Sequence, residues 1–189
     1  GTLVPGNYSI TYVNGALTVA PASLIVTADN ASKTYGQTAT LSSQAFTSAG
    51  LVNGDVIGSV QVASEGAPAS ANVASGPYAI TPSAAAGGFV PGNYSITYVN
   101  GVLTLVPAPL TVTALDASKI YGQTAVLPVT GFTSQGLVNG DTITQVTNHS
   151  PGEVATAPVA GNPYFITPSA ATGNLMPSNY RISYVDGAL

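Results

Sequence analysis

The chain has 189 residues, of which 45% are hydrophobic, and its 3 basic and 7 acidic side chains give a net charge of −4. It contains no cysteine, which excludes disulfide scaffolds, zinc fingers and thiol chemistry. Three scattered cations cannot form a nucleic-acid-binding face, and no apolar run of roughly 18 residues is present for membrane insertion. Solubility must come from neutral Ser, Thr, Asn and Gln side chains, a coat that suits an extracellular location.

The sequence repeats itself with an offset of 86 residues, and residues 23–103 are identical to residues 109–189 at 47 of 81 positions. Repeats of this length can each bury a modest core. We therefore predict the C-terminal hairpin of a preceding module at 1–21, a complete β-rich module at 22–108 and a second module lacking its last strand at 109–189. Short proline links join the modules, so neighbouring modules should nearly touch.

The first predicted element is a hairpin with its turn at Asn14-Gly15, because Asn-Gly between alternating runs favours a type I′ turn. The turn recurs at Asn100-Gly101 and, as Asp186-Gly187, in the third copy. A two-residue loop would place one apolar set on a buried face. This set consists of Tyr8, Ile10, Tyr12, Leu17 and Val19.

Further strands are predicted at 24–28, with a copy at 110–114, and then at 56–63 and 78–82. No stretch shows a sustained helical period, so at most one short helical turn fits, around 50–55. The pattern predicts an all-β fold that is mainly antiparallel.

Tyrosine occupies only four positions of the repeat. These side chains could form a glycan-stacking platform, or they could be core and corner residues with the hydroxyl at the rim. We favour the structural interpretation, because two of the positions fall on the apolar hairpin face.

Candidate catalytic groups differ between the two copies, since His149 aligns with Ala63 and Glu65 with Pro151. We interpret His149 as a solvated loop residue, and we predict no catalytic, cofactor-binding or metal-binding residues and no cofactor. A calcium site needs several carboxylates, whereas Asn53-Gly54-Asp55 and its copy offer one each. We interpret that tripeptide as a turn whose Asp caps backbone N–H groups.

A single lysine recurs at the same place in each module, as Lys33 and Lys119. It could be a surface cation paired with Asp55 or Asp141. Alternatively, it could be the amine of an isopeptide cross-link to Asn or Asp, which requires a buried lysine with a lowered pKa. Lys33 and Lys119 are therefore isopeptide candidates.

An ordered series of motifs covers nearly the whole chain: Ala117-Ser118-Lys119-Ile120-Tyr121-Gly122-Gln123, Leu137-Val138-Asn139-Gly140-Asp141 and Ile166-Thr167-Pro168-Ser169. This series resembles the MBG domain of the YGX type, a family found as tandem arrays in very large bacterial secreted proteins, including filamentous-haemagglutinin-like adhesins. The resemblance implies a β-grasp-like module, with an immunoglobulin-like sandwich as the alternative. It also implies a bacterial surface or extracellular location, and it brings no catalytic residues.

The function predicted is that of structural spacer or stalk repeats in a bacterial extracellular adhesin or fibre, and not that of an enzyme. The partners expected are neighbouring repeats of the same chain, other fibre chains or surface polysaccharide, without nucleic acid and without membrane insertion. The alternative functions are a polysaccharide- or matrix-binding module and a self-associating filament subunit.

Overall fold

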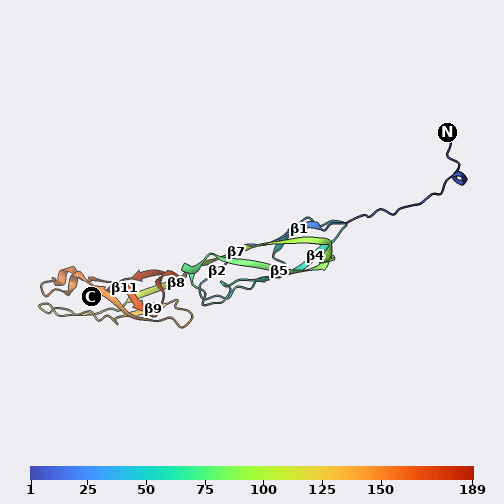
Figure 1. The fold of residues 1–189 in the computed structure, drawn as a ribbon. Helices are drawn as coiled ribbons and strands as arrows, with labels where there is room; N and C mark the ends of the chain where they lie inside the picture. Colours follow the sequence, from blue (N-terminus) through green and yellow to red (C-terminus); the bar gives the residue numbers. More distant parts are fainter.

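The computed structural model describes residues 1–189, and it shows two all-β modules arranged end to end, with a single extended segment leading to the N-terminus (Figure 1). The only helices are six short 3-10 turns. The prediction of an all-β tandem array is therefore confirmed.

The strands of the first module are β1 (Ala22–Ala28), β2 (Ala31–Thr34), β3 (Phe46–Ala49), β4 (Val56–Ala63), β5 (Tyr78–Gly88), β6 (Tyr94–Val99) and β7 (Gly101–Val106). Those of the second are β8 (Ala108–Ala114), β9 (Phe132–Gln135), β10 (Ile143–His149), β11 (Phe165–Gly173), β12 (Tyr180–Val185) and β13 (Gly187–Ala188).

The first module is built around two parallel strand pairs, in which β1 and β2 from its beginning lie beside β6 and β7 from its end. β1 pairs with β6 from Ala22↔Tyr94 onward, and β2 pairs with β7 from Ala31↔Leu103 onward, so both pairs keep one register. β3 lies antiparallel on the other side of β1, which gives the order β3-β1-β6. A first strand beside a parallel strand from the end of the module agrees with the β-grasp-like expectation, although no α-helix covers this sheet. Six of the nine strand pairs are antiparallel and three are parallel, so the sheets are mixed and, as predicted, mainly antiparallel.

The predicted hairpin at Asn100-Gly101 is wrong. β6 and β7 do not pair with each other but follow one another in line, β6 beside β1 and β7 between β2 and β5. Gly101 is required for another reason: a Cβ atom there would lie 2.5 Å from the carbonyl oxygen of Asp29. In this copy the predicted buried face is right, since Tyr94, Leu103 and other alternate residues of these strands point inward. In the N-terminal segment it is wrong, because the corresponding Tyr8 and Leu17 are 61% and 92% exposed.

Residues 8–20 form no strand, so the predicted hairpin of the segment 1–21 is also absent (Figure 1). The segment contains only one 3-10 turn, η1 (Pro5–Asn7). The copy of this segment forms β6 and β7. Each of these strands pairs with a strand 72 residues earlier in the chain, Tyr94 with Ala22 and Leu103 with Ala31, and residues 8–20 have no such partner in the structure.

Each module packs its apolar side chains along its long axis. In the first module one cluster joins β1, β4 and β6 through Leu24, Val26, Val60 and Tyr94, and a second lies further along at Ala28, Ile80, Leu103 and Leu105. The strands predicted at 24–28, 56–63 and 78–82 are confirmed, β5 continuing to Gly88. The predicted helical turn around 50–55 is wrong, because Asn53 and Gly54 form a β-turn with positive φ angles of 57° and 79°.

The second module repeats this plan. β8 pairs in parallel with β12 from Ala108↔Tyr180 onward and antiparallel with β9. The residues that correspond to β2, 117–120, form no strand. β7 ends at Val106 and β8 begins at Ala108, so only Pro107 separates the last strand of one module from the first strand of the next.

Candidate functional site: the joint between the modules

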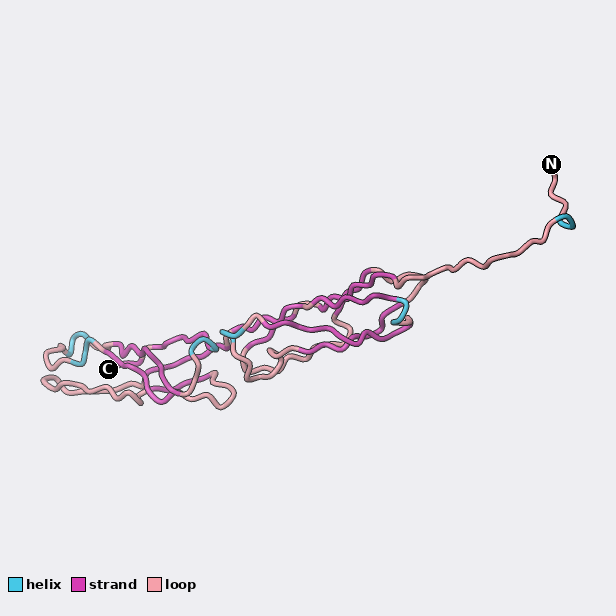
Figure 2. Tube along the Cα trace, viewed as in Figure 1, coloured by secondary structure: helices cyan, strands magenta, loops and turns pink.

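The contact between the two modules is the most elaborate polar and apolar site in the structure, and it lies where they meet end to end (Figure 2). The parallel strands β2 and β7 of the first module both lead to this joint. β7 continues through Pro107 into β8. β2 ends at Thr34 and is followed by Tyr35, whose backbone N–H donates to the carbonyl of Val106 at 2.9 Å. The second module is therefore held by a covalent link and, beside it, by Tyr35.

Tyr35 is only 6% exposed because it packs on the second module. Its ring meets that of Tyr180 edge-on, with centroids 5.4 Å apart at 78°. Its hydroxyl donates to Oδ2 of Asp141 at 3.1 Å, and the Tyr180 hydroxyl donates to the same oxygen at 2.6 Å. One carboxylate thus ties together a tyrosine from each module.

The backbone of Gly36 lies directly against Val138 of the second module. A Cβ atom on Gly36 would lie 2.6 Å from a methyl carbon of Val138, closer than side chains can approach. Gly36 also has a φ of +88°, which favours glycine. The Tyr-Gly dipeptide therefore combines a large side chain that inserts with a residue that leaves room for the neighbouring module.

Asn179 forms the second polar contact and is 1% exposed. Its Oδ1 accepts from the backbone N–H of Val73 at 2.9 Å, and its Nδ2 donates to Oδ1 of Asn72 at 2.9 Å. A third contact runs from Nδ2 of Asn139 to the carbonyl of Ala69 at 3.0 Å. Contacts around the covalent link restrict bending of the joint, because any tilt must break at least one of them.

The plug is Tyr35 and Gly36 together with Ala69 and Val73 at the end of the first module. The socket is the surface of the second module that receives it, formed by Val138, Asn139, Asp141, Asn179 and Tyr180.

Burial and the hydrogen bond to Asp141 raise the pKa of Tyr180 to about 12. The corresponding residue of the first module, Tyr94, donates to Asp55 at 2.6 Å, and chiefly this bond raises its pKa. In both modules the tyrosine is a donor to a carboxylate, so the neutral phenol is the form that the site stabilises.

The two aspartates lie in the predicted turns, but their carboxylates do not cap backbone N–H groups as predicted. The turns themselves are confirmed, since the N–H of Asp55 donates to Val52 and that of Asp141 to Val138, each at 3.0 Å. The carboxylates instead accept from tyrosine hydroxyls. The local Asn-Gly-Asp sequence indicates the turn, whereas the tyrosine that donates to the carboxylate lies on a strand about 40 residues later in the chain.

In each module the lysine lies at the end opposite to the aspartate of the Asn-Gly-Asp turn. The predicted pairing of the lysines with Asp55 or Asp141 is therefore wrong. Lys33 is 7% exposed, and its Nζ donates to the backbone carbonyls of Gln37 at 2.9 Å, Ala67 at 3.2 Å and Pro68. Lys119 likewise donates to Gln123 at 3.1 Å and to Val154. These bonds tie the segment after β2 to the loop after β4.

Burial lowers the pKa of Lys33, as an isopeptide amine would require. However, the only ion pair within 4.0 Å joins His149 and Glu153, so no carboxylate lies beside either lysine. The cross-link at Lys33 or Lys119 stays a prediction, which intact-mass measurement tests through the loss of one water or ammonia.

Most of the tyrosines in the modules anchor their own module, as the structural interpretation predicted. Tyr78 donates to the carbonyl of Asn72 at 2.8 Å, and Tyr98 accepts from the N–H of Ala85 at 2.9 Å. The exceptions are Tyr35, which packs on the second module, and its copy Tyr121, which is 64% exposed. The sequence did not reveal the intermodular role of Tyr35. Tyr35 and Tyr121 lie in the same Tyr-Gly-Gln-Thr motif, so the motif does not show that only Tyr35 packs on a neighbouring module.

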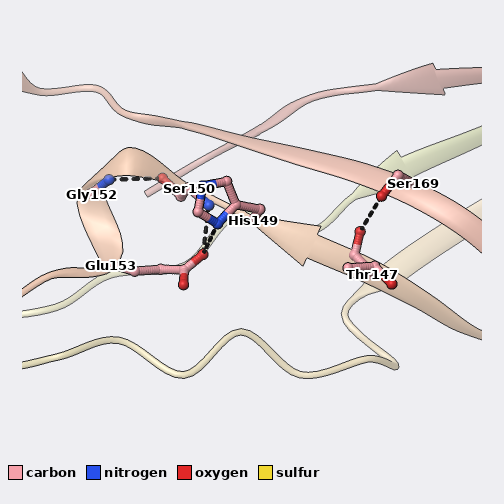
Figure 3. A network of polar contacts seen from close by, with 6 residues as sticks. All are labelled: Thr147, His149, Ser150, Gly152, Glu153 and Ser169. Carbon is pink, nitrogen blue, oxygen red and sulfur yellow. Dashed lines mark hydrogen bonds and ion pairs between the residues drawn. The ribbon is translucent and has the colours of Figure 1, made fainter.

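His149, Ser150 and Glu153 are the residues that most resemble a catalytic group, and Figure 3 shows how they lie. The carboxylate of Glu153 accepts from the N–H of Ser150 at 2.5 Å and lies 3.4 Å from the ring of His149. The Ser150 hydroxyl accepts from the N–H of Gly152, and no hydrogen bond joins it to the imidazole. This is a capping box at a 3-10 turn. The His149 side chain is 76% exposed, as predicted, but the residue is the last of β10 and does not lie in a loop.

No group of three or more His, Cys, Asp and Glu side chains is gathered as a metal site would need. None of the helices has the length and apolarity of a membrane span.

The fold and the joint define a class of protein: a tandem array of all-β repeat modules that dock on one another end to end. The chain belongs to the MBG domain (YGX type) family, whose model matches residues 24–104 and residues 110–189. Tyr35-Gly36 and Tyr121-Gly122 fit the YGX description. No curated protein and no solved structure matches the chain.

Proposed function

We propose that these modules are stiff spacer repeats of a bacterial extracellular adhesin or fibre, which hold an adhesive region away from the cell surface. The observation that carries the proposal is the docked joint, in which Tyr35 and Asn179 add non-covalent contacts to a one-residue link. A flexible string would need only the link. A cysteine-free chain with few charged side chains also suits export and function outside the cytoplasm.

The strand arrangement makes each module efficient at adding length. Ala22 pairs with Tyr94, and from Tyr94 the chain runs through β6 and β7 to Ala108, the start of the next module. These strands lie along the long axis of the molecule (Figure 1). At a rise of about 3.3 Å per residue, each repeat advances by about 45 Å.

A distance measurement across the joint tests stiffness. Spin labels on cysteines at Gln61 and Thr147, exposed and equivalent positions, should report a single narrow distance near one repeat in a pulsed electron resonance experiment. Replacing Gly36→Val should broaden that distribution, because the added side chain meets Val138. The proposal is wrong if the unmodified joint already gives a broad distribution.

Gly122→Val provides the matched control. Gly122 has a φ of +91°, close to that of Gly36, but a Cβ atom there meets nothing within 4 Å. Both substitutions therefore carry the same backbone strain, and only Gly36→Val disturbs the joint. Equal broadening by the two would mean that the effect comes from strain within a module. The alternative, a polysaccharide- or matrix-binding module, stays a prediction.

A further inference from the structure

The joint holds two phenol groups, one from the plug and one from the socket, at a single carboxylate oxygen. The hydroxyls of Tyr35 and Tyr180 lie 3.1 Å and 2.6 Å from Oδ2 of Asp141, and the ring centroids are 5.4 Å apart. The other aromatic pair of the structure, Phe89 with Tyr94, contains only one phenol. Two tyrosines in contact can be coupled by oxidation, through a bond between ring carbons next to the hydroxyls. The joint is therefore the place where such a coupling has both of its partners.

Asp141 is placed to accept the proton that each phenol must release when it loses an electron. Burial and the hydrogen bond to Asp141 raise the pKa of Tyr180 to about 12, so the neutral phenol is the form that is oxidised. Loss of an electron makes a phenol strongly acidic, and a carboxylate within hydrogen-bond distance is then the proton acceptor. Asp141 is only half-buried, so it can pass one proton to water before it receives the next.

We propose that Tyr35 and Tyr180 are an oxidative cross-linking site that locks the two modules together. A one-electron oxidant outside the protein, of the kind that a peroxidase forms from hydrogen peroxide, removes one electron from each ring, and one proton leaves each hydroxyl through Asp141. The two phenoxyl radicals join through the carbons beside their oxygens. The hydrogen on each joined carbon then moves to the oxygen, which restores both phenols. For each cross-link, one hydrogen peroxide accepts two electrons and two protons and becomes two molecules of water.

The surroundings of the two rings favour coupling within the joint over other products. Tyr35 and Tyr180 are only 6% and 5% exposed, so their radicals are shielded from water and from other chains. The oxidant need not touch the rings, because an electron can leave through the surrounding protein. The new bond is a second covalent connection between the modules, beside the link through Pro107. A chain without cysteine has no disulfide that could serve this purpose.

Oxidation of the full chain followed by trypsin digestion tests the proposal. The probe is a photoexcited ruthenium tris(bipyridine) complex with persulfate, which removes single electrons, and the monomer is isolated by size before it is unfolded and digested. Trypsin cleaves after Lys33, Lys119 and Arg181, so Tyr35 and Tyr180 fall in separate peptides, 34–119 and 120–181. We expect these two peptides to be joined, with their summed mass less two hydrogen atoms and with the blue fluorescence of coupled tyrosines.

Three phenylalanine variants show which rings are joined. Tyr35→Phe and Tyr180→Phe should each abolish the joined peptides, because each removes one phenol while leaving a ring in place. Tyr121→Phe, which changes the exposed copy of Tyr35, should leave the yield unchanged. Circular dichroism verifies that all three variants fold. An oxidised monomer without joined peptides overturns the proposal, and so does a joined product that survives either Tyr35→Phe or Tyr180→Phe.

Asp141→Asn tests the path of the proton. An amide oxygen can still accept a hydrogen bond, but it does not take up a proton at neutral pH, so the rate of cross-linking should fall by at least about tenfold. An unchanged rate would mean that Asp141 is not the proton acceptor. The proposal rests on the docked joint from which the spacer function is argued. If the spin-label distance is narrow and no cross-link forms, only the cross-linking proposal fails.

Discussion

Tyr35 and Tyr121 show that the surroundings of a residue, rather than its motif, determine what it does in this protein. Both lie in Tyr-Gly-Gln-Thr, yet Tyr35 is 6% exposed and Tyr121 is 64% exposed. The difference is the module that follows Tyr35. The motif therefore carries the capacity to dock, and burial occurs only where a socket is present.

The buried phenol of Tyr180 makes the joint sensitive to alkaline pH. Its pKa of about 12 lies above the ordinary value of 10.0, so between these values the folded chain retains a proton that the unfolded chain loses. Stability from this group is complete below pH 10 and is lost as the pH rises toward 12. Melting temperatures should fall over this range, and less steeply in Tyr180→Phe.

Absorbance at the phenolate band measures the same effect directly. The difference between the titration curves of the unmodified chain and of Tyr180→Phe should show one ionisation near pH 12. An ionisation near pH 10 instead would mean that this hydroxyl is not buried against Asp141 in solution.

At the level of elements, alternation in the sequence predicts which side chains are buried but not which strand lies alongside. The inward set of β6 and β7 was predicted correctly, because it depends only on the two-residue period of a strand. The pairing was wrong, because the same pattern fits a hairpin and a strand whose parallel partner lies 72 residues earlier, as Tyr94 lies from Ala22. Asn-Gly favours a turn locally, and here the close approach of Asp29 accounts for the glycine.

Gly101→Ala tests this explanation, with Gly15→Ala as the matched control in the same motif. A Cβ atom on Gly101 would lie 2.5 Å from a carbonyl oxygen of Asp29, whereas Gly15 has nothing within 4 Å. Gly101→Ala should lower the free energy of unfolding by about 1–3 kcal/mol, as overpacking does. Gly15→Ala should stay within about 0.5 kcal/mol. Urea unfolding measures both, and equal losses would contradict the explanation.

The joint was only partly predictable for a related reason. Short proline links and an 86-residue period indicated that neighbouring modules touch, and the structure confirms contact. The residues that form the contact could not be identified, because Tyr35 and Asp141 are 106 positions apart. The turn at Asn139-Gly140 was recognised from its dipeptide, but nothing in that dipeptide indicates that a neighbouring module packs on it.

For the molecule as a whole, the placement of the chain ends determines how a pulling force acts. The first module is entered at β1 and left at β7, and these segments run parallel over the pairs 22↔94 to 27↔99 and 31↔103 to 34↔106. Tension on the two ends therefore slides the segments along each other. In this geometry the interstrand hydrogen bonds are loaded together rather than one after another.

Single-molecule pulling from the chain ends should show one unfolding event per module, each releasing roughly 260 Å of chain. The control uses the same module pulled between cysteines at Ser23 and Ser95, exposed residues paired across β1 and β6. Pulling at these points separates the strands from one end, so each hydrogen bond bears the load in turn. We expect an unfolding force several times lower in this direction. Similar forces in both directions would mean that the parallel pair does not carry the load, and the strength of the module would then have to come from its apolar clusters.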